Sequence, residues 1–299
     1  MGTSIDSSRR RYGPVGECIY CGSKSDLRRE HIIPSSLRGT WVLAKASCEI
    51  CAKITREFEQ KVAREMFGAF RAQFGLPSST HKKGGGIRIV PLDIEKAGKQ
   101  HTEHFPAHDM PIVPVLMPLY PSPGILSNRA PSVGFPPQLD CLIWRPSKKK
   151  QRQGSVIEEL VTPQVSGVWH TINISEDAFC RMLAKIAHAA TIAHYGLGAV
   201  PSFLADYILG RNQAFLHVVG CSPDPCGHIS DHVPWGIEFG TFNRGDQHFS
   251  TVKIELFRFL FLSSIKDGRG PTYWVTVGPA DQRLTKFLAK TPPYPLPTQ

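Results

Sequence analysis

The hydrophobic positions that follow residue 52 repeat with the period of a helix. Apolar side chains recur every four residues, and Gly75 and Pro77 then supply stop signals. The repeat predicts one long helix from Ala52. We interpret its apolar stripe as intramolecular core, with contact to a second domain or a second subunit as the alternative for its distal half. The repeating positions are Ile54, Phe58, Val62, Met66, Phe70 and Phe74.

A second helical repeat follows Ser175, a residue type that favours the N-cap position. Gly196 or Gly198 is expected to end this helix, and a shorter helix is predicted over residues 202–209. The apolar face of the longer helix consists of Phe179, Leu183, Ile186, Ala190 and Ala193.

Shorter apolar runs between clusters of glycine, proline and aspartate predict strands. Two of them precede the long helix, at residues 30–33 and 41–43. The later ones lie at 87–90, 139–144, 168–174, 214–219, 235–242, 249–261 and 272–277. The spacing of the last four suits antiparallel pairing, so the chain is predicted to be α+β, with a mainly antiparallel sheet in its larger part.

The turn and loop signals between these elements predict four regions. Residues 1–14 are expected to form a flexible basic arm, 15–75 a small module, 76–110 a linker, and 111–299 an α+β recognition or regulatory domain. A chain of 299 residues has room for two domains, and the small module uses only about a quarter of it.

Charge and composition narrow the class of protein. Lys and Arg number 35 against 25 Asp and Glu, which gives a net charge of +10 and favours a polyanionic partner. No apolar run of about 18 residues or export signal is evident, so a cytoplasmic protein with no membrane association is predicted. Four of the eight cysteines fall in metal-type pairs, which argues against a secreted disulfide scaffold.

Those pairs, Cys18-x2-Cys21 and Cys48-x2-Cys51, bracket the dipeptide Glu30-His31. Two such pairs can present four thiolates to one zinc ion in tetrahedral geometry, which is a closed structural site. An acid beside a histidine places a metal ligand next to a proton acceptor. This combination is typical of nuclease chemistry.

These motifs, with Glu-His-Ile-Ile-Pro from Glu30 and Ala-Ser-Cys from Ala46, resemble the four-cysteine form of the HNH (ββα-metal, His-Me finger) endonucleases over residues 15–75, about a fifth of the chain. The resemblance implies a structural Zn²⁺ on the four cysteines, a catalytic Mg²⁺ or Mn²⁺ on Glu30, and His31 as general base. It implies a metal-dependent endonuclease, with DNA favoured over RNA, and suggests bacterial restriction or anti-phage defence. The candidate nucleic-acid contacts are Arg28, Arg29, Arg38, Lys53, Arg56, Lys82 and Lys83.

One position departs from the family pattern. The family carries Asn or His as a second metal ligand directly after the last cysteine, and this chain has Ala52, whose methyl group cannot coordinate a hard cation. We therefore expect the chain as written to be a weak or inactive nuclease. An engineered inactivating substitution is favoured, with a natural degenerate copy as the alternative.

Several alternatives remain open from the sequence. The module could be a non-catalytic zinc unit that binds nucleic acid or a protein, and residues 111–299 could bind a small-molecule or protein regulator. A homodimer would let two modules cut both strands. Two further groups of possible metal ligands are less favoured than the motif cysteines, because their spacing is loose or cramped and interrupted by proline. They are His101, His104 and His108, and Cys221, Cys226, His228 and His232.

Overall fold

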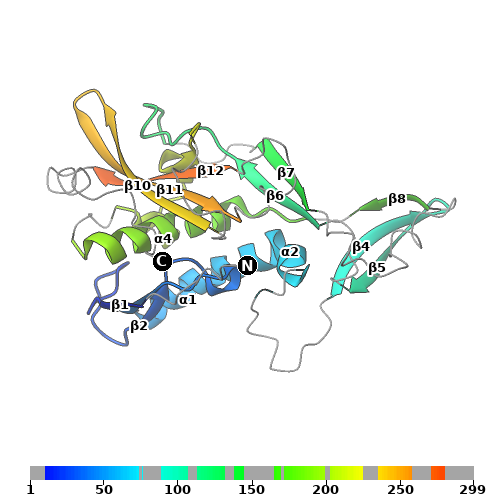
Figure 1. Ribbon diagram of the computed structural model, residues 1–299, viewed down its shortest axis with the longest axis horizontal. Helices are drawn as coiled ribbons and strands as arrows, with labels where there is room; N and C mark the ends of the chain where they lie inside the picture. The colour runs from blue at the N-terminus through cyan, green and yellow to red at the C-terminus, as the bar shows by residue number, and fades with distance from the viewer. Residues whose placement is uncertain are drawn as a thin grey trace, which may run out of the picture.

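A computed structural model shows the α+β architecture that the sequence predicts (Figure 1). It describes residues 11–73, 76, 89–106, 113–131, 138–144, 165–169, 172–198, 203–224, 235–257 and 271–279. The predicted tail after residue 279 and the basic residues Lys82 and Lys83 lie outside this set.

The N-terminal module has the strand, strand, helix order that its motif implies. Strands β1 (Arg11–Pro14), β2 (Arg28–His31) and β3 (Val42–Ser47) form a sheet of order β1-β3-β2, with the short 3-10 helix η1 (Ser35–Leu37) between the last two. β2 runs antiparallel to β3, whereas β1 runs parallel to it. The expectation of a flexible arm over 1–14 is therefore wrong for residues 11–14, because β3 offers them a free edge for pairing.

The predicted long helix consists of three consecutive segments. They are α1 (Glu49–Lys61), a π-helical turn η2 (Val62–Met66) and α2 (Gly68–Gln73). Helix α1 begins earlier than predicted because Cys48 takes the extended N-cap conformation. Phe58, Val62, Met66 and Phe70 are all buried, which confirms the apolar stripe.

The region predicted as a linker over 76–110 contains regular structure. Strands β4 (Ile89–Lys96) and β5 (Lys99–Pro106) form an antiparallel hairpin, and β8 (Val165–Trp169) pairs with the other edge of β4. The hairpin turn places both Ala97 and Gly98 at positive φ (50° and 73°), the geometry of a two-residue connection. Strands β6 (Val113–Leu119) and β7 (Gln138–Trp144) form another hairpin.

The C-terminal part contains the predicted helix and the predicted antiparallel sheet. Helix α4 (Glu176–Tyr195) begins after Ser175 and ends at Gly196, and α5 (Ala205–Ile208) follows. The sheet has the order β10-β11-β12-β9, and every pairing in it is antiparallel. Residues 215–217 form the 3-10 helix η5 (Phe215–His217) in place of the predicted strand. The strands are β9 (Val219–Cys221), β10 (Trp235–Arg244), β11 (Gln247–Leu256) and β12 (Thr272–Pro279).

Helix α4 lies between the N-terminal module and this sheet (Figure 1). Every residue from Ala178 to Ile192 except Arg181 is buried, so nearly all sides of α4 face the hydrophobic core. Aromatic contacts join the N-terminal module, α4 and the C-terminal sheet. The ring of Phe67 lies 4.9 Å from that of Phe257 after β11, and Phe179 of α4 lies 5.1 Å from Tyr273 of β12. The distal half of the long helix therefore packs within this chain.

Within the described part of the chain, no helix combines the length and the apolar character that crossing a lipid bilayer requires.

Candidate functional site

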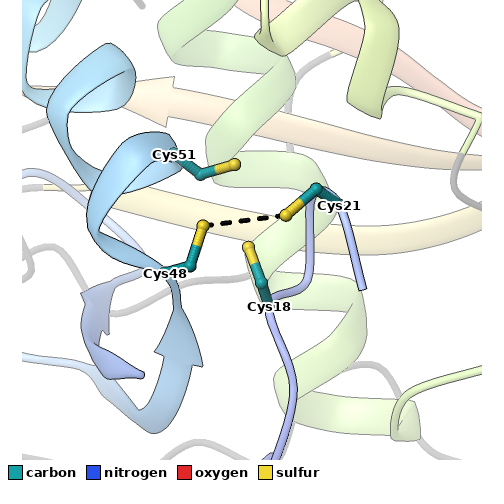
Figure 2. Close-up of side chains that lie close together, drawn as sticks. All are labelled: Cys18, Cys21, Cys48 and Cys51. Carbon is teal, nitrogen blue, oxygen red and sulfur yellow. Dashed lines mark hydrogen bonds between the residues drawn. The ribbon is translucent and has the colours of Figure 1, made fainter. Parts of the chain in front are cut away.

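The four motif cysteines meet at one point. Their sulfur atoms all lie within 4.8 Å of one another, and the Sγ atoms of Cys21 and Cys48 are 3.6 Å apart. Figure 2 shows the four side chains converging from a loop and from the start of α1. Tetrahedral zinc with bonds of about 2.3 Å separates its ligands by about 3.8 Å, so this cluster can hold a zinc ion.

Local backbone geometry builds each half of the cluster. Gly22 has φ +74°, and its N–H donates to the Cys18 carbonyl (2.8 Å), which closes the tight turn of the first pair. In the second pair, Cys48 caps α1 and its carbonyl accepts from the N–H of Ala52 (2.8 Å), so Cys48 and Cys51 flank the first helical turn. All four ligands come from the protein, which leaves no coordination position open for catalysis.

Burial and the neighbouring thiols shift the pKa values of the cluster in different directions. Burial raises the pKa of the Cys18 thiol and, more strongly, that of Cys51. At Cys48 burial also raises the pKa, but hydrogen bonds from Cys51 and the neighbouring thiols outweigh it and lower the value. A bound zinc ion would stabilise all four sulfurs as thiolates.

Glu30 of β2 does not face the solvent. It is 5% exposed, and its Oε1 atom lies 2.8 Å from the Nζ atom of Lys185, a residue of α4 that is 0% exposed. The same Nζ lies 2.8 Å from Oε1 of Glu59 on α1. Lys185 also donates to the backbone carbonyls of His31 and Ile32. Glu30, Glu59 and Lys185 are hereafter the charge cluster.

The electrostatics of the charge cluster keep the lysine ionised. Burial lowers the pKa of Lys185, but the carboxylates of Glu30 and Glu59 outweigh burial and raise it. Burial raises the pKa of Glu59, an effect that the Lys185 charge opposes. Burial, with the charge of Glu30 next in size, also raises the pKa of the neighbouring Tyr20 hydroxyl well above its usual range.

The residues present do not fit the expected catalytic Mg²⁺ or Mn²⁺. A divalent cation on Glu30 would have to displace the Lys185 ammonium or approach it closely, and like charges in a buried site repel strongly. Ala52, partly exposed in the first turn of α1, offers only a methyl group. The prediction that Glu30 binds a catalytic metal therefore gains no support from this arrangement.

His31, the expected general base, lies at the end of β2 opposite Val42 of β3. Its side chain is partly buried, and burial, followed by the charges of Lys185 and Arg29, lowers its pKa below the usual 6.5. The ring is therefore neutral at pH 7 and able to accept a proton.

The basic residues near the module are mostly free to meet a ligand. Arg29, Arg38, Lys53 and Arg56 are exposed, and Arg28 is exposed but paired with Glu49. The charge of these side chains therefore lies at the surface of the module.

The weaker metal candidates gain no support within the described residues. His101 pairs with Glu103 at 2.8 Å, and the Cys221 sulfur accepts from the Tyr120 N–H at 3.3 Å. Among the described residues, the four motif cysteines form the only group of three or more His, Cys, Asp or Glu side chains close enough to share a metal ion. His108, Cys226, His228 and His232 lie outside the described residues.

Sequence reasoning missed Lys185 and Glu59. A signal for Lys185 existed, because it is the only formally charged residue between Met182 and Ala193 in the predicted helix. A lysine within an apolar helical run is rarely buried without a partner. Its partner could not be named from that run alone.

No protein family, curated protein or solved structure shows a significant match to this chain.

Proposed function

We propose that this chain is a zinc-stabilised module of the HNH endonuclease type, joined to an α+β domain, that binds nucleic acid and lacks metal-dependent cleavage in its present sequence. The carrying observation is the 2.8 Å contact between the Lys185 ammonium and the Glu30 carboxylate, at the position where the resemblance expects a metal ligand. Ala52 removes the second expected ligand. The exposed basic side chains of the module support binding of nucleic acid.

The expected target is DNA before RNA. Arg29 of β2 and Arg38 after η1 are exposed, Lys53 and Arg56 are exposed on α1, and the whole chain has a net charge of +10. Phosphate contacts of this kind give affinity that falls steeply with salt.

A binding assay tests this proposal. Labelled duplex DNA and structured RNA are titrated with the zinc-loaded chain at 50 and 200 mM salt, and with an Arg29→Glu/Arg56→Glu variant. We expect duplex DNA to bind more tightly than RNA, and the variant to bind it about tenfold or more weakly, with a smaller salt dependence. An exposed pair away from the module, Lys96→Glu/Lys99→Glu, serves as the matched control. Unchanged affinity in the module variant would contradict the proposal.

A second candidate, a competent endonuclease, is favoured by His31, which is neutral at pH 7 and partly accessible at the end of β2. Plasmid nicking by the Ala52→Asn variant with Mg²⁺ or Mn²⁺ separates the two candidates. Cutting that disappears in Ala52→Asn/His31→Ala, with zinc content unchanged, would establish the nuclease. Absence of cutting, with DNA binding retained, supports the binding module.

The charge cluster is separate from residue 52. Lys185 lies 154 residues from His31 in the chain, and its contacts with Glu30 and Glu59 do not involve residue 52. Lys185 also lies outside residues 15–75, which carry the resemblance, so Ala52 stays the one departure from the family pattern. A role in restriction or anti-phage defence stays a prediction from the resemblance.

A further inference from the structure

The Lys185 ammonium is surrounded by oxygen atoms of other residues. Oε1 of Glu30 and Oε1 of Glu59 each lie 2.8 Å from Nζ. The backbone carbonyl oxygen of His31 also accepts from Nζ, and that of Ile32 lies 3.4 Å away. An ammonium has three protons to donate, so four oxygens saturate it.

Such a set of oxygens is the ligand type that hard divalent cations prefer. Mg²⁺, Mn²⁺ and Ca²⁺ bind carboxylates and backbone carbonyls, and two carboxylates supply enough negative charge to balance one dication. We call these four atoms, from Glu30, Glu59, His31 and Ile32, the oxygen cage. Without the lysine, the cage would carry an uncompensated double negative charge in a buried location.

The cage is built by elements that do not depend on the lysine side chain. Glu30 and His31 lie on β2, which β3 holds in register. Glu59 lies on α1, whose first turn carries two of the cysteines. Lys185 enters from α4, on the opposite side of the interface between the module and the C-terminal part.

We infer that the oxygen cage is a hard-cation site whose resident cation is the Lys185 ammonium. The lysine excludes divalent metal because it is covalently tethered, fully buried and in contact with both carboxylates. Removing the ammonium therefore converts the cage into a divalent-metal site. The inference does not depend on nucleic-acid binding or cleavage, since it concerns only what occupies the cage.

Manganese titration of the zinc-loaded full chain tests this directly. Calorimetry and the loss of the free Mn²⁺ electron paramagnetic resonance signal report binding. We expect the Lys185→Ala variant to bind one Mn²⁺ per chain at least tenfold more tightly than wild type, which should show only weak surface association. Glu30→Gln/Lys185→Ala should lose this gain, because one anionic ligand is removed. Equal Mn²⁺ binding by wild type and Lys185→Ala would overturn the inference.

A thermal measurement covers the case in which Lys185→Ala folds poorly. Mn²⁺ at about 100 times its Kd should raise the Tm of that variant by roughly 5–10 °C. The triple variant Glu30→Gln/Glu59→Gln/Lys185→Ala, in which the cage is neutral, should show no such rise. If Lys185→Ala remains unfolded in millimolar Mn²⁺ while the triple variant folds, the cage cannot accept a metal and the inference is wrong. If both variants remain unfolded at every Mn²⁺ concentration, metal cannot replace the ammonium and the inference is equally wrong.

Discussion

The chain contains two charged centres that lie close to β2, and they are built in opposite ways. The cysteine cluster takes its four sulfurs from one loop and the start of α1, within the 34 residues from Cys18 to Cys51, and can hold an external cation. The charge cluster takes Glu30, Glu59 and Lys185 from three elements and contains its own cation.

The difference teaches how a cation can be supplied to a protein interior. A zinc ion must be recruited from solution, and its binding free energy becomes part of the folding free energy. A lysine is already part of the chain, but burying it costs desolvation that only well-placed oxygens offset. With zinc bound, the first centre would make the fold depend on metal concentration, whereas the second joins distant segments whatever the solution contains.

The largest expected effect comes from removing zinc. Chelation, or the Cys51→Ser substitution, leaves crowded thiols without an ion and should unfold the N-terminal module, since structural zinc contributes roughly 10 kcal/mol or more in comparable sites. Elemental analysis and circular dichroism measure zinc content and helix loss. Cys180→Ser, a buried cysteine outside the cluster, is the matched control and should keep full zinc content. A chain that contains no zinc, or that melts identically without it, would contradict this prediction.

The next effect comes from removing the resident cation alone. Lys185→Met leaves two acids without their partner and should cost about 3–5 kcal/mol, which lowers the Tm of a chain this size by roughly 6–20 °C. Thermal or urea unfolding of the zinc-loaded chain measures the loss.

The neutral triple variant Glu30→Gln/Glu59→Gln/Lys185→Met provides the control for that experiment. We expect it to recover most of the lost stability, because replacing a whole buried ion cluster costs far less than breaking it. Equal stability of wild type and Lys185→Met would mean that the cluster contributes little to folding.

A smaller effect concerns the pH dependence of folding through His31. Its folded pKa lies below the usual 6.5, so the neutral ring is favoured by folding. The associated stability is fully present above about pH 6.5 and is lost as the pH falls through the lowered folded value. His31→Gln should flatten this part of the stability curve, because glutamine does not titrate in this range. Urea unfolding between pH 5 and 7.5 measures it, and an unchanged slope would contradict the shift.

The smallest effect links His31 to the charge cluster. The Lys185 charge is the second cause of the lowered His31 pKa, after burial. In the neutral triple variant that charge is absent, and so is the smaller, opposing charge of Glu30, so the His31 pKa should rise toward 6.5. NMR titration of the imidazole protons gives the value. The same pKa in wild type and triple variant would contradict a net effect of the charge cluster on His31.

Part of the fold was predictable because its signals are local. The helices after residues 48 and 175 follow from apolar periodicity and from their start and stop residues, and the antiparallel sheet over 235–279 follows from spaced strands. The hairpin formed by β4 and β5 was predicted as linker. Its lysines, histidines and glutamates are exposed along β5, so the strand lacks the alternation that marks a buried face. Pairing of residues 11–14 with β3 also depends on a neighbour that the local sequence does not indicate.

The sequence by itself determined the cysteine cluster, because two Cys-x2-Cys pairs bring their own turn and helix start with them. It also identified His31 as a candidate base beside an acid. Only the tertiary structure decided that this acid, Glu30, is buried and paired with a lysine. Packing of α4 against α1 brings Lys185 to Glu30. Because the two residues are far apart in sequence, no spacing pattern in the sequence predicts this ion pair. The physical reason is that burial and the nearest charge, which set the role of a carboxylate, are properties of the folded chain.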